Sequence, residues 1–250
     1  MRLKELVRFL DEYLKIKEIE DNSLNGMQIE GKSDVQTVAL ATDACSETFI
    51  KAASLRADML IVHHGIFWGK QYPITGIHAE RFRTLLTNGI TLYAAHLPLD
   101  LHPEVGNNVE LVRLTGFTPT EPFGKYHGVV IGYKGISKKA VRYETIINTI
   151  RRKLNTETIG YTFGKDRITS LAVVSGDGAS MLEQVTDTDI DLFITGENDH
   201  ISYHIARELK VNIIYAGHYA TETLGVKSLS RVLKKEHSLN TLFIDVPTGM

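Results

Sequence analysis

The stretch ADMLIVHHGIFWG (Ala57–Gly69) decides the fold. It runs as an unbroken apolar segment from Met59 and ends on two adjacent histidines, His63 and His64. A short apolar run without polar alternation is typical of a strand that is buried on both faces, as in a parallel sheet covered by helices. Two imidazoles at the end of such a strand indicate a ligand site at the edge of the sheet.

The segments on either side of this strand alternate between strand-like and helical patterns. TVALATD (37–43) and ITLYAAH (90–96) are strand-like, whereas SETFIKAASL (46–55) and AERFRTLLTN (79–88) are helical. The order βαβαβ predicts a parallel α/β sheet with helices on its faces.

A second run of the same types starts near Ser170. Strand-like SLAVVSG, DLFITGE and VNIIYAGH are separated by helical MLEQVTD (181–187) and ISYHIARELK. Asp191 opens the second of these strands as Asp58 opens the apolar run quoted above. The repeated order of strand-like and helical segments, together with the repeated residue types, predicts an internal duplication.

Polar residues recur at the ends of the strands in both runs. His96 and Asp100 are four residues apart after LYAA, and His218 and Glu222 are four residues apart after IYAG. Two βαβαβ units look alike even when unrelated, but the doubled spacing favours a true repeat.

The duplication predicts two domains. GKYHGVVIGYKG (124–135) and the helical YETIINTIRRKL (143–154) are interpreted as an edge strand and a helix of the second domain.

Composition limits the class of protein. With 250 residues, 43% hydrophobic and 23% charged, the whole chain should fold. The formal net charge of -2 provides no basic field for nucleic acid. Cys45 is the only cysteine, which excludes a disulfide framework and a thiolate metal cluster and favours the cytoplasm. The N-terminus reads as an amphipathic helix, and no segment reaches the length of a membrane span, so we expect no membrane partner.

The polar residues at the strand ends predict a metal site. In parallel sheets the carboxyl ends of the strands meet at one edge, where ligands bind. Imidazoles and carboxylates crowded there would be costly to desolvate, and a divalent cation offsets that cost. Donors without sulfur suit zinc, iron, manganese, cobalt or nickel. The predicted ligands are His63, His64, Asp100, His218 and Glu222.

The number of ions depends on the two adjacent histidines. Neighbouring residues of a strand point to opposite faces, so His63 and His64 reach one ion only if the chain leaves strand geometry, which Gly65 permits. Otherwise each serves a different ion of a two-metal site. We favour two ions, with Asp100 or Glu222 bridging them.

The remaining histidines are not predicted to be metal ligands. His96 is a catalytic candidate that contacts substrate or orients a ligand. His200 and His204, four residues apart on one helix face, could line the same crevice, although packing is the preferred interpretation. Bystander roles are expected for His78, His102, His127 and His237.

Five motifs together resemble one known family. They are NGMQIEG (25–31), IVHHGIFW (61–68), HLPLDLHPEVGNN (96–108), TGE (195–197) and GHYATE (217–222). The chain resembles the GTP cyclohydrolase I type 2 homologue family, also called NIF-three-like proteins, and in particular its bacterial YbgI-like branch. The resemblance implies a dinuclear metal site at the five predicted ligands. It also implies two similar three-layer α/β/α domains that exchange C-terminal strands. With that exchange, we expect the first domain to comprise residues 1–123 with 226–250 and the second to comprise residues 124–225. The resemblance further implies a ring-shaped homohexamer with its metal sites facing the interior.

The leading hypothesis for function is a metal-dependent hydrolase. The family name implies attack on the imidazole ring of a guanine nucleotide. Phe67 and Trp68 could stack on a heterocycle, with core or interface packing as the alternative, and Lys70 or Lys125 could meet phosphate. No glycine-rich phosphate loop is present.

Glu197 is the candidate general acid or base, or else a charge at a helix N-terminus. The alternative functions are a non-catalytic oligomeric metal scaffold or metal-delivery protein and, less favoured because of the net acidity, a ring that binds single-stranded nucleic acid.

Overall fold

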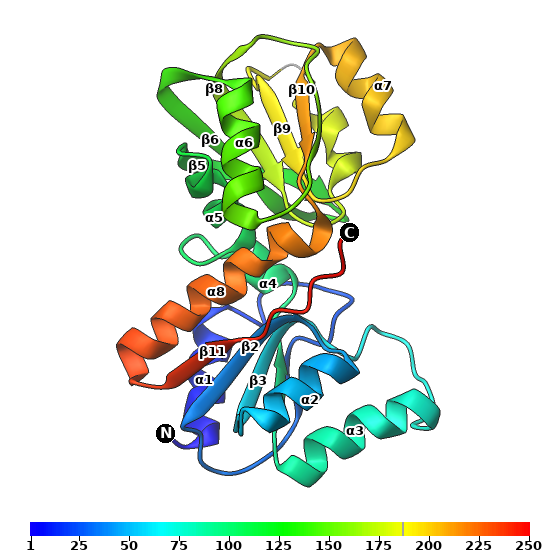
Figure 1. Cartoon of the computed structure of the whole chain (residues 1–250), viewed down its shortest axis with the longest axis vertical. Helices are drawn as coiled ribbons and strands as arrows, with labels where there is room; N and C mark the ends of the chain where they lie inside the picture. Colours follow the sequence, from blue (N-terminus) through cyan, green and yellow to red (C-terminus); the bar gives the residue numbers. More distant parts are fainter. Residues whose placement is uncertain (187) are drawn as a thin grey trace. The chain divides into compact units, whose positions relative to one another are not determined.

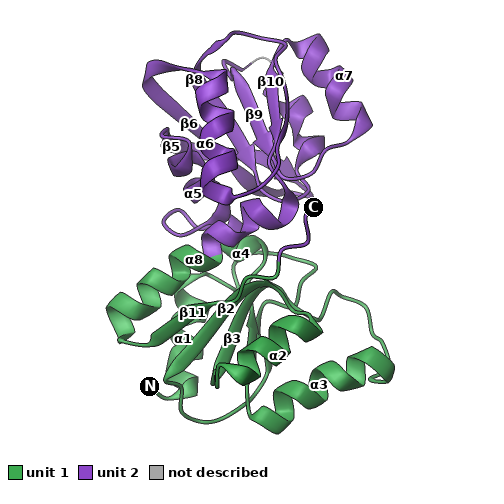
Figure 2. Ribbon diagram, viewed as in Figure 1, with its two compact units in different colours: residues 1–99, 226–246 green, residues 100–225, 247–250 purple. Residues whose placement is uncertain are grey.

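The structure is a computed structural model, and it describes residues 1–186 and 188–250. The chain forms two compact units, residues 1–99 with 226–246 and residues 100–225 with 247–250 (Figure 2). Within the described residues, no helix is both long and apolar enough to span a membrane.

The first unit contains a five-stranded sheet in the order β1-β4-β3-β2-β11. The strands are β1 (Gly26–Ile29), β2 (Thr37–Asp43), β3 (Met59–His64), β4 (Thr91–Ala94) and β11 (Asn240–Phe243). As predicted, β2, β3 and β4 are parallel, and every residue of β3 before His64 is buried. Only β1 runs antiparallel, alongside β4.

Helices cover the sheet of the first unit (Figure 1). They are α1 (Leu3–Tyr13), α2 (Ser46–Ser54), α3 (Gly76–Asn88) and the C-terminal part of α8 (His218–His237). The amphipathic N-terminal segment forms α1, which buries Leu3, Leu6 and Leu10. The core of this unit gathers Phe49 and Leu85 from the helices around the strands.

The last strand, β11, returns to the first unit. It pairs in parallel with β2 from Asn240 opposite Thr37 to Phe243 opposite Leu40. The second sheet takes all its described strands from residues 118–215. Among the described residues, the first sheet therefore receives a strand that follows the second unit in the sequence, and the second sheet receives no strand from the first unit.

The second unit contains a six-stranded sheet in the order β5-β6-β8-β9-β10-β7. The strands are β5 (Thr118–Tyr126), β6 (Val129–Arg142), β7 (Ile159–Tyr161), β8 (Arg167–Val174), β9 (Leu192–Thr195) and β10 (Asn212–Tyr215). Its helices are α5 (Asn107–Leu114), α6 (Tyr143–Leu154), η1 (Ala179–Val185) and α7 (His200–Leu209), and α4 (Leu97–Asp100) lies at the unit boundary. The helix predicted over 181–187 is the 3₁₀ helix η1, and residue 187 lies outside the described residues.

Two expectations for the second unit need correction. The single edge strand expected at 124–135 is the end of β5 and the start of β6, because His127 and Gly128 both take positive φ and close a hairpin. The division at residue 123 also differs from the compact units, which divide after Leu99. The physical reason is that β5 pairs with β6 and α5 packs on the same sheet.

The two sheets repeat one arrangement. The order β1-β4-β3-β2 matches β7-β10-β9-β8, and in both the first strand alone is antiparallel. The Asp58 carboxylate accepts the backbone N–H of Gln36 and Thr37, as the Asp191 carboxylate accepts those of Thr169 and Ser170. These matches support the predicted duplication.

Strand pairing gives the register of the repeat. Val62 faces Ala94 in the first sheet, and Thr195 faces Tyr215 in the second. If Asp58 is equivalent to Asp191, this register makes His96 equivalent to Gly217. The sequence comparison, which aligns His96 with His218, is therefore displaced by one residue from the structural equivalence.

Candidate metal centre

Three histidines gather at the carboxyl edge of the first sheet. His63 and His64 end β3, and His96 follows β4. One ring nitrogen from each of the three lies within 4.8 Å of the others. The ring centroids of His63 and His64 are 4.6 Å apart, and those of His63 and His96 are 5.1 Å apart. The three imidazoles are therefore close enough to act on one bound group.

The rings of His63 and His64 lie close together although neighbouring side chains of a strand point to opposite faces. Both histidines belong to β3, but the pairing of β3 with β4 ends at Val62. Beyond Val62, β3 pairs only with β2, so its strand geometry is held from one side. Gly65 does not adopt a left-handed conformation. Instead, a Cβ there would lie 2.7 Å from the Cβ of Ala94 and 2.3 Å from Nε2 of Gln28, so crowding requires the glycine.

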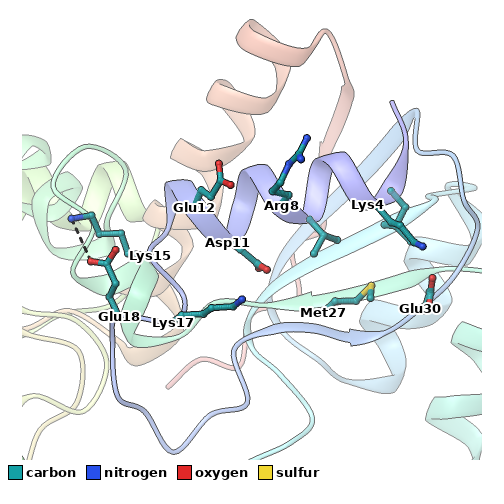
Figure 3. A pocket seen from close by; sticks show the side chains of 11 residues that line it. Lys4, Arg8, Asp11, Glu12, Lys15, Lys17, Glu18, Met27 and Glu30 are labelled. Atoms are coloured by element: carbon teal, nitrogen blue, oxygen red, sulfur yellow. Dashed lines mark ion pairs between the residues drawn. The ribbon is translucent and has the colours of Figure 1, made fainter.

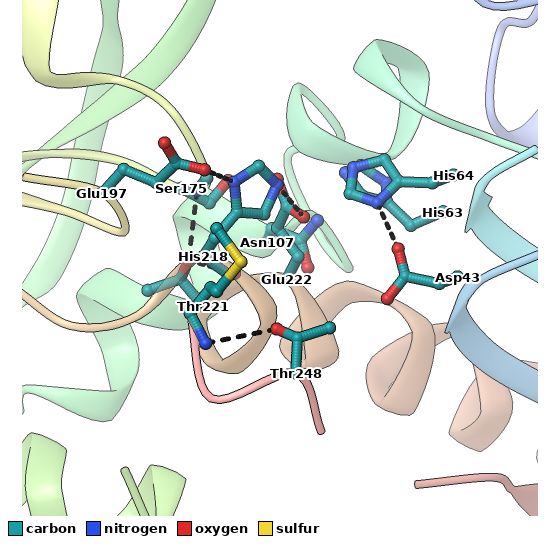
Figure 4. A network of polar contacts seen from close by, with 12 residues as sticks. Asp43, His63, His64, Asn107, Ser175, Glu197, His218, Thr221, Glu222 and Thr248 are labelled. Carbon is teal, nitrogen blue, oxygen red and sulfur yellow. Dashed lines mark hydrogen bonds and ion pairs between the residues drawn. The ribbon is translucent and has the colours of Figure 1, made fainter. Parts of the chain in front are cut away.

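Each of these histidines has an oxygen acceptor at Nδ1. The Ala95 carbonyl lies 3.0 Å from Nδ1 of His63. Asp43 Oδ1 lies 2.8 Å from Nδ1 of His64, as Figure 4 shows. Because a carbonyl only accepts, Nδ1 of His63 carries the proton and Nε2 keeps the lone pair. Metal-binding histidines commonly hold the second ring nitrogen in this way.

Asp21 plays the corresponding part for His96. Its Oδ2 lies 3.0 Å from Nδ1 of His96, and it also accepts the backbone N–H of Leu97. Burial alone would raise the pKa of Asp21, but hydrogen bonds and charge from His96, together with Asn25 and Ser23, outweigh burial and lower it to about 2. The carboxylate is thus charged at neutral pH and holds the ring of His96.

The second unit contributes a histidine between two carboxylates. His218 and Glu222 occupy the start of α8, one turn apart, and Nε2 of His218 lies 2.9 Å from Oε2 of Glu222. Glu197 Oε1 lies 2.5 Å from Nδ1 of His218 (Figure 4). Burial would lower the pKa of His218, but Glu222 and Glu197 outweigh burial and raise it to about 9. A site with this surplus of negative charge favours a cation.

Asp100 also lies in the second unit, at the end of α4. Its side chain is buried, and Oδ1 accepts hydrogen bonds from Nδ2 of Asn107 at 2.8 Å and from the Ser175 hydroxyl at 3.1 Å. These two donors fix the position of the Asp100 carboxylate.

The loop after β8 contacts both Asp100, through Ser175, and the residues at the start of α8, through Gly176. Gly176 follows Ser175, takes a φ of +62°, and donates its N–H to the Thr221 hydroxyl. A Cβ at Gly176 would lie 2.1 Å from Oε1 of Glu222 and 3.3 Å from Nε2 of His218. Only glycine fits, so this loop packs directly against the donor atoms of α8.

The aromatic residues after the histidines differ in environment. Phe67 packs beside Phe82 and Tyr72 in the core of the first unit, as the packing alternative predicted. Trp68 is 38% exposed, and its ring centroid lies 4.9 Å from that of His96 in an edge-on arrangement. Trp68 is therefore the aromatic residue that borders the histidine group.

The remaining predicted residues lie elsewhere. Buried His102 accepts the N–H groups of Glu104 and Val105 at Nδ1, which is a structural role. The other expected bystanders and the two lysines are spread over both units: His78 packs on Tyr72, His237 packs on Phe9, and His127, Lys70 and Lys125 are exposed. His200 and His204 are exposed on α7.

Comparison with known proteins identifies the family. A family model described as Duf34/NIF3 (NGG1p interacting factor 3) matches residues 1–249. The chain belongs to the DUF34/NIF3 family. This confirms the resemblance that the motifs carried.

Curated and solved relatives of this NIF3 chain are similar over their whole length. A protein of Pyrococcus horikoshii is 50% identical over 98% of both chains, and one of Pyrococcus abyssi is 47% identical over 100% of both. Both are described as GTP cyclohydrolase 1 type 2 homologues. The structure of TTHA1606 from Thermus thermophilus matches with a TM-score of 0.92 and 41% identity, and that of ybgI, of unknown function, with 0.92 and 35%; each match covers 100% of both chains.

The motifs of the NIF3 chain did not predict the residues that contact the candidate ligands. Asp21 and Asp43 contact His96 and His64 from distant parts of the chain, and Ser175 and Asn107 contact Asp100. Only Asp43 had a local signal, since it ends a predicted strand in parallel with the one that ends on His64.

The first unit of the NIF3 chain also contains a groove that is lined by apolar and charged side chains. The groove, of about 520 Å³, lies between α1 and β1 (Figure 3). Leu3, Val7 and Met27 contribute apolar surface, and side chains of both charge signs, among them Lys4, Arg8, Asp11 and Glu30, also line it. It contains no histidine or cysteine, so it does not resemble the metal-donor groups.

Proposed function

We propose that this chain binds two divalent metal ions through His63, His64, Asp100, His218 and Glu222, and that it is a metal-dependent hydrolase. The observation that carries the proposal is shared by four histidines. In each of them Nδ1 contacts an oxygen acceptor, namely Ala95 O, Asp43, Asp21 or Glu197, and metal-binding histidines commonly hold the ring nitrogen that does not bind the ion in this way.

The donor set fits a divalent transition metal. Neutral imidazole nitrogens and carboxylate oxygens without thiolate suit zinc, iron, manganese, nickel or cobalt. The negative charge around His218 and the buried Asp100 carboxylate both favour occupation by cations. When bound, such ions supply Lewis acidity and activate water for hydrolysis.

The protein residues around the donors have separate roles in this proposal. Asp43 and Asp21 hold the rings of His64 and His96. Glu197, expected as a general acid or base, contacts His218, which supports a positioning role for it. His96, held by Asp21 and grouped with His63 and His64, serves as a further donor or moves a proton to or from substrate.

The proposed substrate is a nucleotide or related heterocycle. Relatives of the chain are described as GTP cyclohydrolase 1 type 2 homologues, which supports a purine ring as the electrophile. Trp68, exposed beside His96, offers a surface on which such a ring could stack.

Metal analysis combined with turnover tests the function. Purified chain is stripped with chelator, reloaded with manganese, zinc, iron or nickel, and assayed against a panel of nucleotides and phosphoesters. We expect turnover that requires metal and is lost in His64→Ala, whereas His78→Ala, outside the donor groups, retains it. Two bound ions per chain without turnover in any case would support a metal scaffold or delivery protein, and a chain that binds no metal would contradict both.

We also propose that the chain assembles as a ring-shaped homohexamer. Exposed apolar side chains on and near α2 and α3 support an interface there, because large exposed apolar residues commonly mark contact surfaces. They are Ile50, Leu55, Ile74, Ile77 and Leu86. Light scattering should give six times the mass of 28.0 kDa, and a monomer at all concentrations would contradict the proposal.

A further inference from the structure

A separate pocket of about 540 Å³ lies in the second unit beside the start of α7. Its lining includes three tyrosines, two histidines and one carboxylate: Tyr161, Tyr203, Tyr215, His200, His204 and Asp199. None of these residues belongs to the metal-donor groups described above.

His200 and His204 occupy one face of α7. Residues four apart on a helix lie one turn above each other, and here the ring centroids are 5.2 Å apart with the ring planes at 78°. Two imidazole nitrogens that bind one zinc ion are about 3.3 Å apart, since each Zn–N bond is about 2.05 Å. The two rings, whose centroids are 5.2 Å apart, are therefore near enough for one ion to contact both.

Aromatic contacts restrict where the second of these rings can move. The Tyr203 ring meets His204 edge-on at 5.3 Å between centroids, and Tyr161 meets Tyr203 edge-on at 4.8 Å. Tyr215 is buried, and its hydroxyl contacts that of Ser202 at 2.5 Å. The wall behind the histidines is therefore a packed aromatic group.

The charges of the pocket favour a cation. A helix N-terminus ordinarily attracts anions, but Asp199 already caps α7 by accepting the Ser202 N–H at 2.7 Å. Among the described residues that line the pocket there is no lysine or arginine, and the Asp199 carboxylate is their single fixed charge.

We propose that His200 and His204 form a second metal site that holds a single divalent ion such as Zn²⁺, Ni²⁺ or Cu²⁺. Two imidazoles one turn apart on one helix face are a recognised chelating pair, and imidazole nitrogen prefers these ions to magnesium or calcium. Water completes the coordination, which makes this site open and exchangeable.

Chemical footprinting tests the site in the full chain. Chelator-treated protein is reacted with diethyl pyrocarbonate with and without Zn²⁺, and modification of each histidine is read by peptide mass spectrometry. We expect zinc to protect His200 and His204 together. In His200→Gln, protection of His204 should require about tenfold more zinc or more, because even the outer partners of metal ligands change affinity by that much.

A matched variant controls for nonspecific protection. His127→Asn replaces an exposed histidine with a residue that tolerates its positive φ, and it should leave the protection of His200 and His204 unchanged. Circular dichroism confirms that His200→Gln keeps its helices. Equal modification of His200 and His204 with and without zinc, or unchanged protection of His204 in His200→Gln, would overturn the site.

Discussion

At the residue scale, the oxygen acceptors at Nδ1 distinguish these histidines from ordinary polar residues. Asp43, Asp21 and Glu197 all come from segments far from the histidine that they contact. Sequence spacing finds donors that are close along the chain, such as His218 with Glu222, because one helical turn brings them together. It cannot find a carboxylate that tertiary folding supplies.

Replacement of an outer carboxylate should weaken metal binding without unfolding the chain. We expect Asp43→Asn to lower metal affinity by about 10–100-fold, because His64 loses the acceptor that fixes its ring and raises its basicity. Competition with a chromogenic chelator measures the change. Asp34→Asn, which removes an exposed partner of Arg2, is the matched control. Equal affinities for the two variants would contradict the role of Asp43.

Gly176 should be required at the second donor group. In Gly176→Ala the new Cβ meets Oε1 of Glu222, and the φ of +62° adds strain for alanine. We expect loss of metal binding, measured as metal content after dialysis, together with a lower melting temperature. Gly116→Ala, which carries similar strain with nothing within 4 Å, should lower the melting temperature and keep its metal. If Gly176→Ala kept its full metal content, the close packing of this loop on Glu222 would be irrelevant to the site.

At the element scale, the alternation of apolar strands and helices was predictable because buried parallel strands are almost wholly apolar, as β3 is up to His63. The hairpin of β5 and β6 was not predicted, although HG at 127–128 is a turn signal that flanking strand patterns would have strengthened. The 3₁₀ geometry of η1 has no comparable signal in MLEQV.

The start of each apolar strand depends on its aspartate. Burial would raise the pKa of Asp191, but hydrogen bonds from Thr169 and Lys165 outweigh burial and lower it below 3.8. A lowered pKa in the folded state gives stability that is present above 3.8 and is lost as pH falls through the folded-state pKa. Lys165 is exposed, so its contribution is screened and the Thr169 contacts dominate.

Asp191→Asn should therefore destabilise the chain near neutral pH by about 1.5–3 kcal/mol, the range for hydrogen bonds to a charged group. The difference from the unmodified chain should shrink as pH falls below 3.8. Urea unfolding at a series of pH values measures it. Asp189→Asn, two residues earlier in the chain, is the control. A difference that stayed constant across this pH range would contradict the linkage.

Equivalent glycines in the two units provide a test of the repeat. A Cβ at Gly31 would lie 2.4 Å from the Gly89 carbonyl oxygen, and one at Gly164 would lie 2.4 Å from that of Lys210. Both contacts are with backbone, so Gly31→Ala and Gly164→Ala should each cost about 1–3 kcal/mol in unfolding free energy. Gly76→Asn, in open space, should be nearly neutral. A neutral effect at either crowded position would argue against the equivalence.

At the scale of the whole molecule, the sequence predicted two units but placed Asp100 with the first. The HLPLD motif looks continuous with β4, yet Asp100 is fixed by Asn107 and Ser175 of the second unit. The sequence gives the order of residues along the chain, but it does not show with which unit a loop residue makes its contacts.

The return of β11 to the first sheet makes the two units respond differently to truncation. Removal of residues 239–250 deletes β11, exposes the edge of β2 and removes Ile244, which is buried in the core of the first unit. The second sheet takes its described strands from residues 118–215 and keeps all of them. We therefore expect hydrogen exchange to accelerate in β2 and β3 while β8 and β9 retain their protection. Removal of residues 247–250 alone is the control, since it leaves β11 and Ile244 in place, and β2 should then exchange as slowly as in the full chain. Equal loss of protection in both sheets would show that the units unfold together, and unchanged protection of β2 would show that β11 contributes little to the first sheet.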